Sequence, residues 1–181
     1  ALDGLGLFDE AIDAYRGALK IEPHNASLHN NLGAVLQGLG RFDEAISCFR
    51  KSLAIRGDSV EALNNLGDTL HVVDRLEEAG DCFRRAFELA PSDGLRIKLA
   101  LLLSPFHASV DALEQSRRIL VSEIDALCAK PAVLVDPLHE VNAAPFYLGF
   151  QGFNDRELMM RIGELFRDAL PEGASPNLPM P

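Results

Sequence analysis

Two pairs of adjacent asparagines are the residues of this sequence best suited to binding chemistry. Asn30-Asn31 and Asn64-Asn65 each precede a Leu-Gly pair, so the second pair repeats the surroundings of the first. An amide side chain both donates and accepts hydrogen bonds, so amides repeated along one surface can hold a peptide backbone without reading its side chains. We expect Asn31 and Asn65 to be the main partner-binding residues.

Other polar residues could extend this surface. Asn30 and Asn64 could share the role, although each points about a quarter-turn away from its neighbour on a helix. The same concave surface is expected to include three more polar residues: Ser27, Gln37 and Asp68. The alternative is that each asparagine bonds only within its own helical hairpin.

Two patterns that suggest catalysis do not support it. Gly4-x-Gly6 and Gly38-x-Gly40 begin like dinucleotide loops, but they lack the third glycine and recur at equivalent places in a repeat, so we interpret them as hairpin turns. His139-Glu140 opens like a zinc-protease motif, but position 143 is not histidine. We therefore expect no catalytic residue, no metal site and no cofactor, and we expect that this chain alone is not an enzyme.

The asparagines belong to a repeat that runs through the first half of the chain. Gly6–Ala11 recurs as Gly40–Ala45 and, more loosely, as Asp74–Ala79, with the same interval between successive copies. Behind each copy stands an aromatic residue at an equivalent position: Tyr15, Phe49 and Phe83. A regular period of this length is typical of stacked helical hairpins.

The apolar pattern inside one repeat predicts two helices. The first helix has apolar residues at spacings of three and four, which places them on one face: Leu28, Leu32, Val35, Leu36, Leu39 and, one repeat later, Ala62, Leu63, Leu66, Leu70, Val73. Gly33 and Gly67 would let the paired helix approach closely. The second helix should begin at Phe42, with Asp43 and Glu44 in its first turn. Asp58 and Glu61 have the spacing of a capping box for the next helix.

With its small, aromatic and proline positions in place, the repeat resembles the tetratricopeptide repeat (TPR) family over residues 1–95. The resemblance implies an all-α fold, a superhelical solenoid of antiparallel helix hairpins. We expect a truncated first repeat, a degenerate TPR-like helical region over 96–170, and a proline-rich tail or linker over 171–181.

The second half contains two further predicted helices. One should run from Val110 to Ala129 with Ser109 as its N-cap and Val110, Leu113, Leu120, Ile124, Leu127 inward. Arg117 falls in that stripe, either snorkelling to solvent or binding a ligand. Another should follow a capping box at Asn154 and Glu157, with Leu158, Ile162, Leu165, Phe166, Ala169 inward.

Four aromatic residues precede this last helix: Phe146, Tyr147, Phe150 and Phe153. They are either the core of a degenerate hairpin or a docking face for another domain. The stretch Val135–Val141, together with Phe146–Arg156, resembles the segment that joins TPRs to the catalytic half of bacterial O-GlcNAc-transferase-like (SPINDLY-like) glycosyltransferases. In that family an asparagine ladder lines the TPR groove, at the positions of Asn31 and Asn65.

This resemblance implies that the chain is the recognition arm of a protein glycosyltransferase. The rival interpretation is a free-standing TPR scaffold or adaptor. Clustered Lys and Arg on the concave face would favour an adaptor for acidic tails, but Arg41 and Arg75 lie in turns.

Charge and cysteine content limit the partners. The net charge is −10 and the pI about 4.9, which opposes binding to nucleic acid or anionic membranes and favours a protein or peptide partner. Three cysteines without CxxC spacing (Cys48, Cys82, Cys128) indicate reduced, buried thiols in the cytoplasm. We find no signal peptide or membrane span.

We also expect self-association through the truncated first repeat, by way of Tyr15 and Leu19.

Overall fold

The computed structural model describes residues 2–102, 109–130, 133–134, 141 and 156–169, with side chains from residue 8 onward. The chain divides into two compact units, Ala1–Pro91 and Ser92–Pro181. The described residues form eight α-helices and no strand, which confirms the predicted all-α class.

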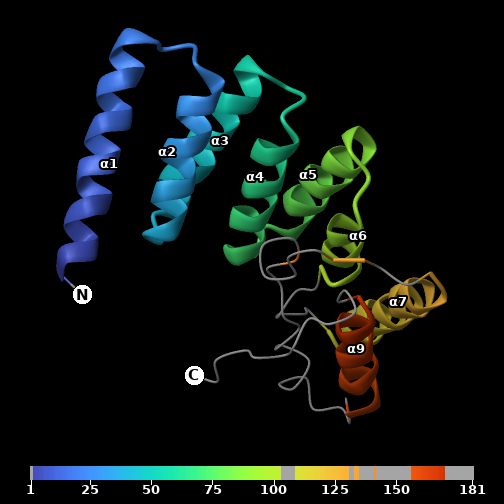
Figure 1. The fold of residues 1–181 in the computed structure, drawn as a ribbon. Coiled ribbons are helices and arrows are strands. Elements are labelled where there is room, and N and C mark those ends of the chain that lie inside the picture. Colours follow the sequence, from blue (N-terminus) through green and yellow to red (C-terminus); the bar gives the residue numbers. More distant parts are fainter. Residues whose placement is uncertain (1, 103–108, 131–132, 135–140, 142–155, 170–181) are drawn as a thin grey trace. The chain divides into compact units, whose positions relative to one another are not determined.

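The first unit is a row of antiparallel helices in which each helix packs on the next (Figure 1). Its helices are α1 (Leu2–Ile21), α2 (Ala26–Gly38), α3 (Phe42–Ile55), α4 (Val60–Val72) and α5 (Leu76–Leu89). The closest packing joins α2 to α3 and α4 to α5, so these are the two complete hairpins. The predicted solenoid of helical hairpins is confirmed.

Short polar side chains begin the first helix of each hairpin. Asn25 Oδ1 accepts from Leu28 N at 3.1 Å, and Ser59 Oγ accepts from Ala62 N at 3.3 Å. The predicted capping box at Asp58 and Glu61 is therefore wrong by one position, because the serine hydroxyl already satisfies an unpaired N–H of the first turn.

The turns inside both hairpins use a left-handed residue at the same repeat position. Gly40 has φ +72° and Asp74 has φ +58°. Glycine adopts this conformation without strain, and aspartate is among the few other residues that tolerate it. The predicted turn at Gly38–Gly40 is confirmed, and the third repeat keeps the turn with aspartate in place of glycine.

The first repeat departs from prediction, because residues 2–21 form one continuous helix. The hairpin turn that we expected at Gly4-x-Gly6 is wrong. The continuous helix satisfies the backbone hydrogen bonds of this segment within α1.

Glycine and phenylalanine hold each hairpin together. A Cβ at Gly33 would lie 2.6 Å from Phe49 Cε1, and one at Gly67 would lie 2.5 Å from Phe83 Cε1. Both rings are fully buried. The predicted close approach at Gly33 and Gly67 is thus confirmed, and each ring occupies the space that the missing side chain leaves.

The second unit packs around its own apolar core, to which α6 (Asp93–Ala100), α7 (Val110–Ala129) and α9 (Arg156–Asp168) contribute. Ser109 caps α7 as predicted, its Oγ accepting from Ala112 N at 3.1 Å. The predicted inward residues of the last helix are confirmed: Leu158, Ile162, Leu165 and Ala169 are buried and Phe166 packs against them. The boundary predicted at residue 95 falls inside α6.

One predicted core position of α7 is wrong. Val110 is exposed, whereas Leu120, Ile124 and Leu127 are buried. Val110 is the first residue of the helix, almost three turns before the segment that enters the core. Arg117 is half-buried.

Candidate peptide-binding face

The predicted binding residues lie on α2 and α4, which are in direct contact. Asn31 and Ser27 are exposed, while Asn65 is half-buried. Asn64, Gln37 and Asp68 are also half-buried, and Asn64 and Asp68 each hold an interaction within the protein. Together with Asn31, five of these residues are accessible from solvent on two helices that are in contact.

Asn30 differs from its neighbours because it is only 4% exposed. Its Nδ2 donates to Glu61 Oε1 at 2.8 Å, and its Oδ1 accepts from Asn65 Nδ2 at 3.2 Å. This chain of side chains joins α2 of one hairpin to α4 of the next. The alternative in which each asparagine bonds only within its hairpin is therefore wrong for Asn30 and Asn65.

The network fixes the direction of the Asn65 amide. Because its Nδ2 points to Asn30, its Oδ1 is the atom left to accept a hydrogen bond from a partner. Asn31 makes no hydrogen bond to the part of the chain that the structure describes, so both of its polar atoms are open. Asn65 thus offers a hydrogen-bond acceptor, and Asn31 offers both a donor and an acceptor. These groups match the alternating N–H and C=O groups of an extended peptide.

The charge of this face is neutral to acidic. Neither α2 nor α4 contains Lys or Arg, while Glu61 and Asp68 contribute carboxylates. Such a surface favours neutral or basic peptides over acidic ones.

A second set of charges, which the sequence analysis missed, follows α1, α3 and α5. Arg16 Nη2 and Arg41 Nη2 approach the carboxylate of Glu44, at 3.6 Å and 2.7 Å. Arg50 and Arg75 bind Glu78 in the same way, one repeat later. The signal was present in the sequence as two arginines and a glutamate that recur at equivalent positions of the next repeat.

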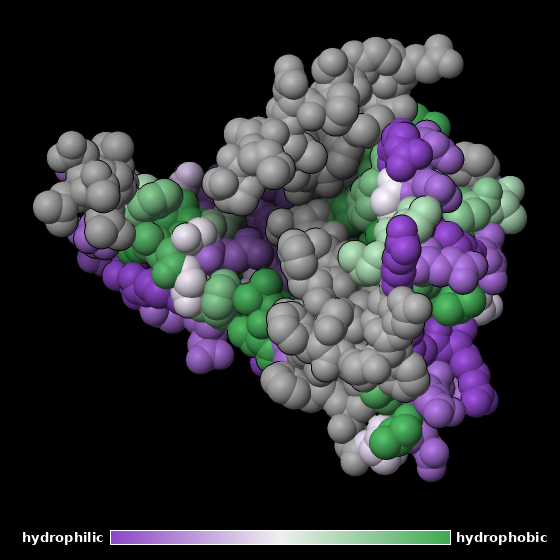
Figure 2. Space-filling model, turned by 90° about the horizontal axis from the view of Figure 1, so that it is seen from below, coloured by the Kyte–Doolittle hydropathy of each residue, from purple (hydrophilic) through white to green (hydrophobic). Residues whose placement is uncertain are grey.

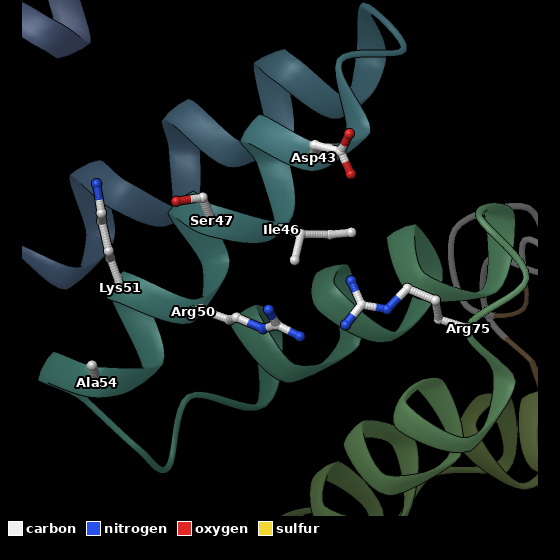
Figure 3. Close-up of a pocket in the computed structure, with 7 residues that line it drawn as sticks. All are labelled: Asp43, Ile46, Ser47, Arg50, Lys51, Ala54 and Arg75. Carbon is white, nitrogen blue, oxygen red and sulfur yellow. The ribbon is translucent and has the colours of Figure 1, made fainter.

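Figure 3 shows Arg50 and Arg75 pointing toward one another at the edge of a shallow depression of about 440 Å³. The hydrogen bond from Arg75 lowers the pKa of Glu78, and the charges of Arg75 and Arg50 act in the same direction. These ion pairs are exposed, so we assign them a minor part in stability.

Sequence comparison identifies the repeats of the first unit. A tetratricopeptide repeat family model matches residues 24–92, and a TPR repeat model matches residues 5–40. Residues 5–92 are tetratricopeptide repeats. No curated protein sequence matches the chain.

Solved structures share the TPR fold. The crystal structure of MamA is similar over 92% of this chain and 89% of its own, with 23% identity and a TM-score of 0.60. MamA from Desulfovibrio magneticus RS-1 covers 72% of each chain at 17% identity and a TM-score of 0.53. An O-GlcNAc transferase of Thermobaculum terrenum matches 70% of this chain at 23% identity and a TM-score of 0.51, over 25% of its own length. At these identities the likeness concerns the fold alone.

The first TPR helix carries the surface for which we predicted self-association. Ile12 is buried, and Tyr15 and Leu19 are half-buried, whereas Phe8 is 42% and Ile21 is 82% exposed. Apolar patches lie beside strongly hydrophilic ones on the described surface (Figure 2). Self-association through α1 stays a prediction.

The thiols of the TPR unit and of the second unit differ. Cys48 is buried and Cys82 half-buried, and burial raises the pKa of both, that of Cys82 to about 11. Cys128 is exposed, which corrects the prediction that all three are buried. It follows Leu127, the last α7 residue in the core, and is turned about 100° from it around the helix.

Three sequence predictions fall on residues that the structure does not describe. The aromatic group Phe146, Tyr147, Phe150 and Phe153, residue Asn154 and the tail 171–181 lie outside the described residues. Within the described helices, none has the length and apolar character needed to cross a bilayer.

Proposed function

We propose that this chain is a protein-interaction module that binds an extended peptide segment along the face of α2 and α4. The observation that carries the proposal is the pair Asn31 and Asn65, one TPR apart, with open hydrogen-bonding atoms above the buried Asn30. Amides at this spacing bind main-chain groups, so recognition depends on the peptide backbone more than on its side chains.

The partner has neutral or basic residues where it crosses this face. Glu61 and Asp68 would repel acidic side chains, and no cation on either helix would hold a carboxylate. This supports a protein partner over nucleic acid and disfavours an adaptor for acidic tails.

A selection of random twelve-residue peptides tests the proposal. We expect the enriched peptides that bind the α2/α4 face to be neutral or basic. Asn31→Ala and Asn65→Ala should each weaken their binding by roughly three- to tenfold, the value of one hydrogen bond. The matched control is Gln115→Ala, which removes an exposed amide from α7 and should leave affinity unchanged. Enriched acidic peptides whose binding falls in the Asn31 and Asn65 variants, or an equal loss in the Gln115 variant, would contradict the proposal.

We further propose that this module is the recognition arm of a cytoplasmic protein glycosyltransferase and presents peptides to a catalytic domain. The support is the resemblance of residues 135–156 to the TPR-to-catalytic junction of O-GlcNAc-transferase-like enzymes, together with the placement of Asn31 and Asn65. The alternative is a free-standing TPR scaffold.

The mass of the native polypeptide in cell extract separates these two functions. The glycosyltransferase function predicts a native chain far larger than 19.7 kDa, with sequence that continues past Pro181. A native chain that ends near Pro181 would remove the enzyme and leave the scaffold. An antibody against the TPR unit and mass spectrometry of the captured chain give the answer.

A further inference from the structure

A cleft of about 500 Å³ opens between α1 and α3, with α2 at its base. Its floor is aliphatic, from Leu19, Leu32 and Leu36, and its rim carries the cations Arg16, Lys20 and Lys51. Asn31 lies two residues beyond His29, a lining residue, and thus about 200° around α2. The cleft is therefore separate from the peptide-binding face.

The repeat itself shows why the cleft is open at this point. Each lining residue has a counterpart one repeat later, between α3 and α5. There Leu63 stands in place of His29 and is only 2% exposed. Ala54 replaces Lys20, and Arg85 replaces Lys51. At this place the second interface has a buried apolar side chain, whereas the first has an imidazole.

These substitutions are linked by a hydrogen bond to an equivalent carbonyl, which a different residue donates in each repeat. Arg85 Nη2 donates to the carbonyl of Gly57 at 2.6 Å. The counterpart of Gly57 is Pro23, and His29 Nε2 donates to its carbonyl at 3.0 Å. Lys51 does not make the equivalent contact, and it forms no hydrogen bond or ion pair with any residue that the structure describes.

The rim carries more positive than negative charge, although the chain has a net charge of −10. Glu44 is the carboxylate among the lining residues, and Arg41 already binds it through two hydrogen bonds of 2.7 and 2.8 Å. Arg16 lies farther from it, at 3.6 Å. The positive charges that remain to bind a ligand are those of Lys20 and Lys51 and part of that of Arg16.

We propose that this cleft binds an acidic segment of a partner protein, with a carboxylate at Lys51 and Lys20 and an aliphatic side chain on Leu32 and Leu36. The positive charge of the rim favours a carboxylate, and the apolar floor favours an aliphatic residue next to it in the peptide. The cleft is open to solvent, so it would leave much of a small molecule exposed, whereas a peptide needs to insert only one or two side chains. The site is additional to the α2/α4 face and takes the opposite charge.

The peptide Glu-Leu-Glu-Leu-Glu with a fluorescein label is a suitable probe, measured by fluorescence anisotropy at low salt. We expect binding that weakens as salt is added. Lys51→Glu should weaken it at least tenfold. Lys130→Glu, at an exposed lysine of the second unit, should change it less than twofold. The Asn31→Ala/Asn65→Ala variant should bind this probe normally, which separates the cleft from the proposed function.

Closing the cleft provides the second test. His29→Leu with Lys51→Arg copies two of the three differences of the second interface into the first, and we expect at least a tenfold loss of probe affinity with no loss of thermal stability. If this variant fails to fold, the Lys51→Glu variant alone tests the proposal, because Lys51 is exposed and its replacement should not affect folding. Retained affinity in the closed variant, no binding by the unmodified protein, or equal binding of Lys-Leu-Lys-Leu-Lys would overturn the proposal.

Discussion

Phe83→Ala is expected to destabilise the TPR unit by about 3–5 kcal/mol, which is the usual effect of removing a fully buried aromatic ring. Phe83 is 1% exposed and lies against the backbone of Gly67. The variant would leave a cavity between α4 and α5 that neither helix can close. Because the free energy of unfolding of a small domain is about 5–15 kcal/mol, a large fraction of the stability of the unit would be lost.

Urea denaturation followed by circular dichroism measures this effect, since the chain has no tryptophan to report by fluorescence. Phe8→Ala is the matched control, because Phe8 is 42% exposed and should contribute less than about 1 kcal/mol. Similar losses in the two variants would show that Phe83 is not a core residue of the hairpin.

Gly33→Ala should destabilise the unit by about 1–2 kcal/mol, although alanine is the better helix former. The new Cβ would meet the Phe49 ring at 2.6 Å, and the ring cannot move because it is itself fully buried. The strain of overpacking exceeds the gain in helix propensity, which is about 1 kcal/mol.

Gly17→Ala gives the opposite sign. Gly17 lies within α1, and a Cβ there would meet nothing within 4 Å. We expect it to stabilise the protein by up to about 1 kcal/mol. The two variants make the same chemical change, so a gain in both thermal midpoints would refute the close contact of α2 with α3.

The sequence was sufficient to predict the helical hairpins and the close approach of their helices at Gly33 and Gly67. The reason is local: apolar residues at spacings of three and four define a helix face, and the regular period of the chain repeats that face. The ring that fills the space at each glycine, as Phe49 does at Gly33, became clear only from the structure.

Contacts between repeats were less predictable. The hydrogen bonds from Asn30 to Glu61 and from Asn65 to Asn30 span 31 and 35 residues, neither of which is the repeat period. They depend on how α2 and α4 are offset in space, which the period does not specify. For the same reason Asn30 was predicted to bind a partner but is buried.

The α1–α3 cleft was missed for a related reason. A repeat is recognised from the residues that its copies have in common. The cleft arises from positions where the copies differ: His29 corresponds to Leu63, and Lys51 corresponds to Arg85. Only the two carbonyl contacts, at Pro23 and Gly57, show that these differences act together.

The central claim is that the α2/α4 face binds a peptide through its backbone, and affinity measurements on three versions of one selected peptide test it most directly. The versions are the peptide itself, a scrambled sequence of the same composition, and a backbone N-methylated form. We predict that scrambling changes the Kd less than about threefold, whereas N-methylation weakens binding at least about tenfold and removes the effect of Asn65→Ala. Tight binding of the N-methylated peptide, with loss of binding on scrambling, would contradict the account.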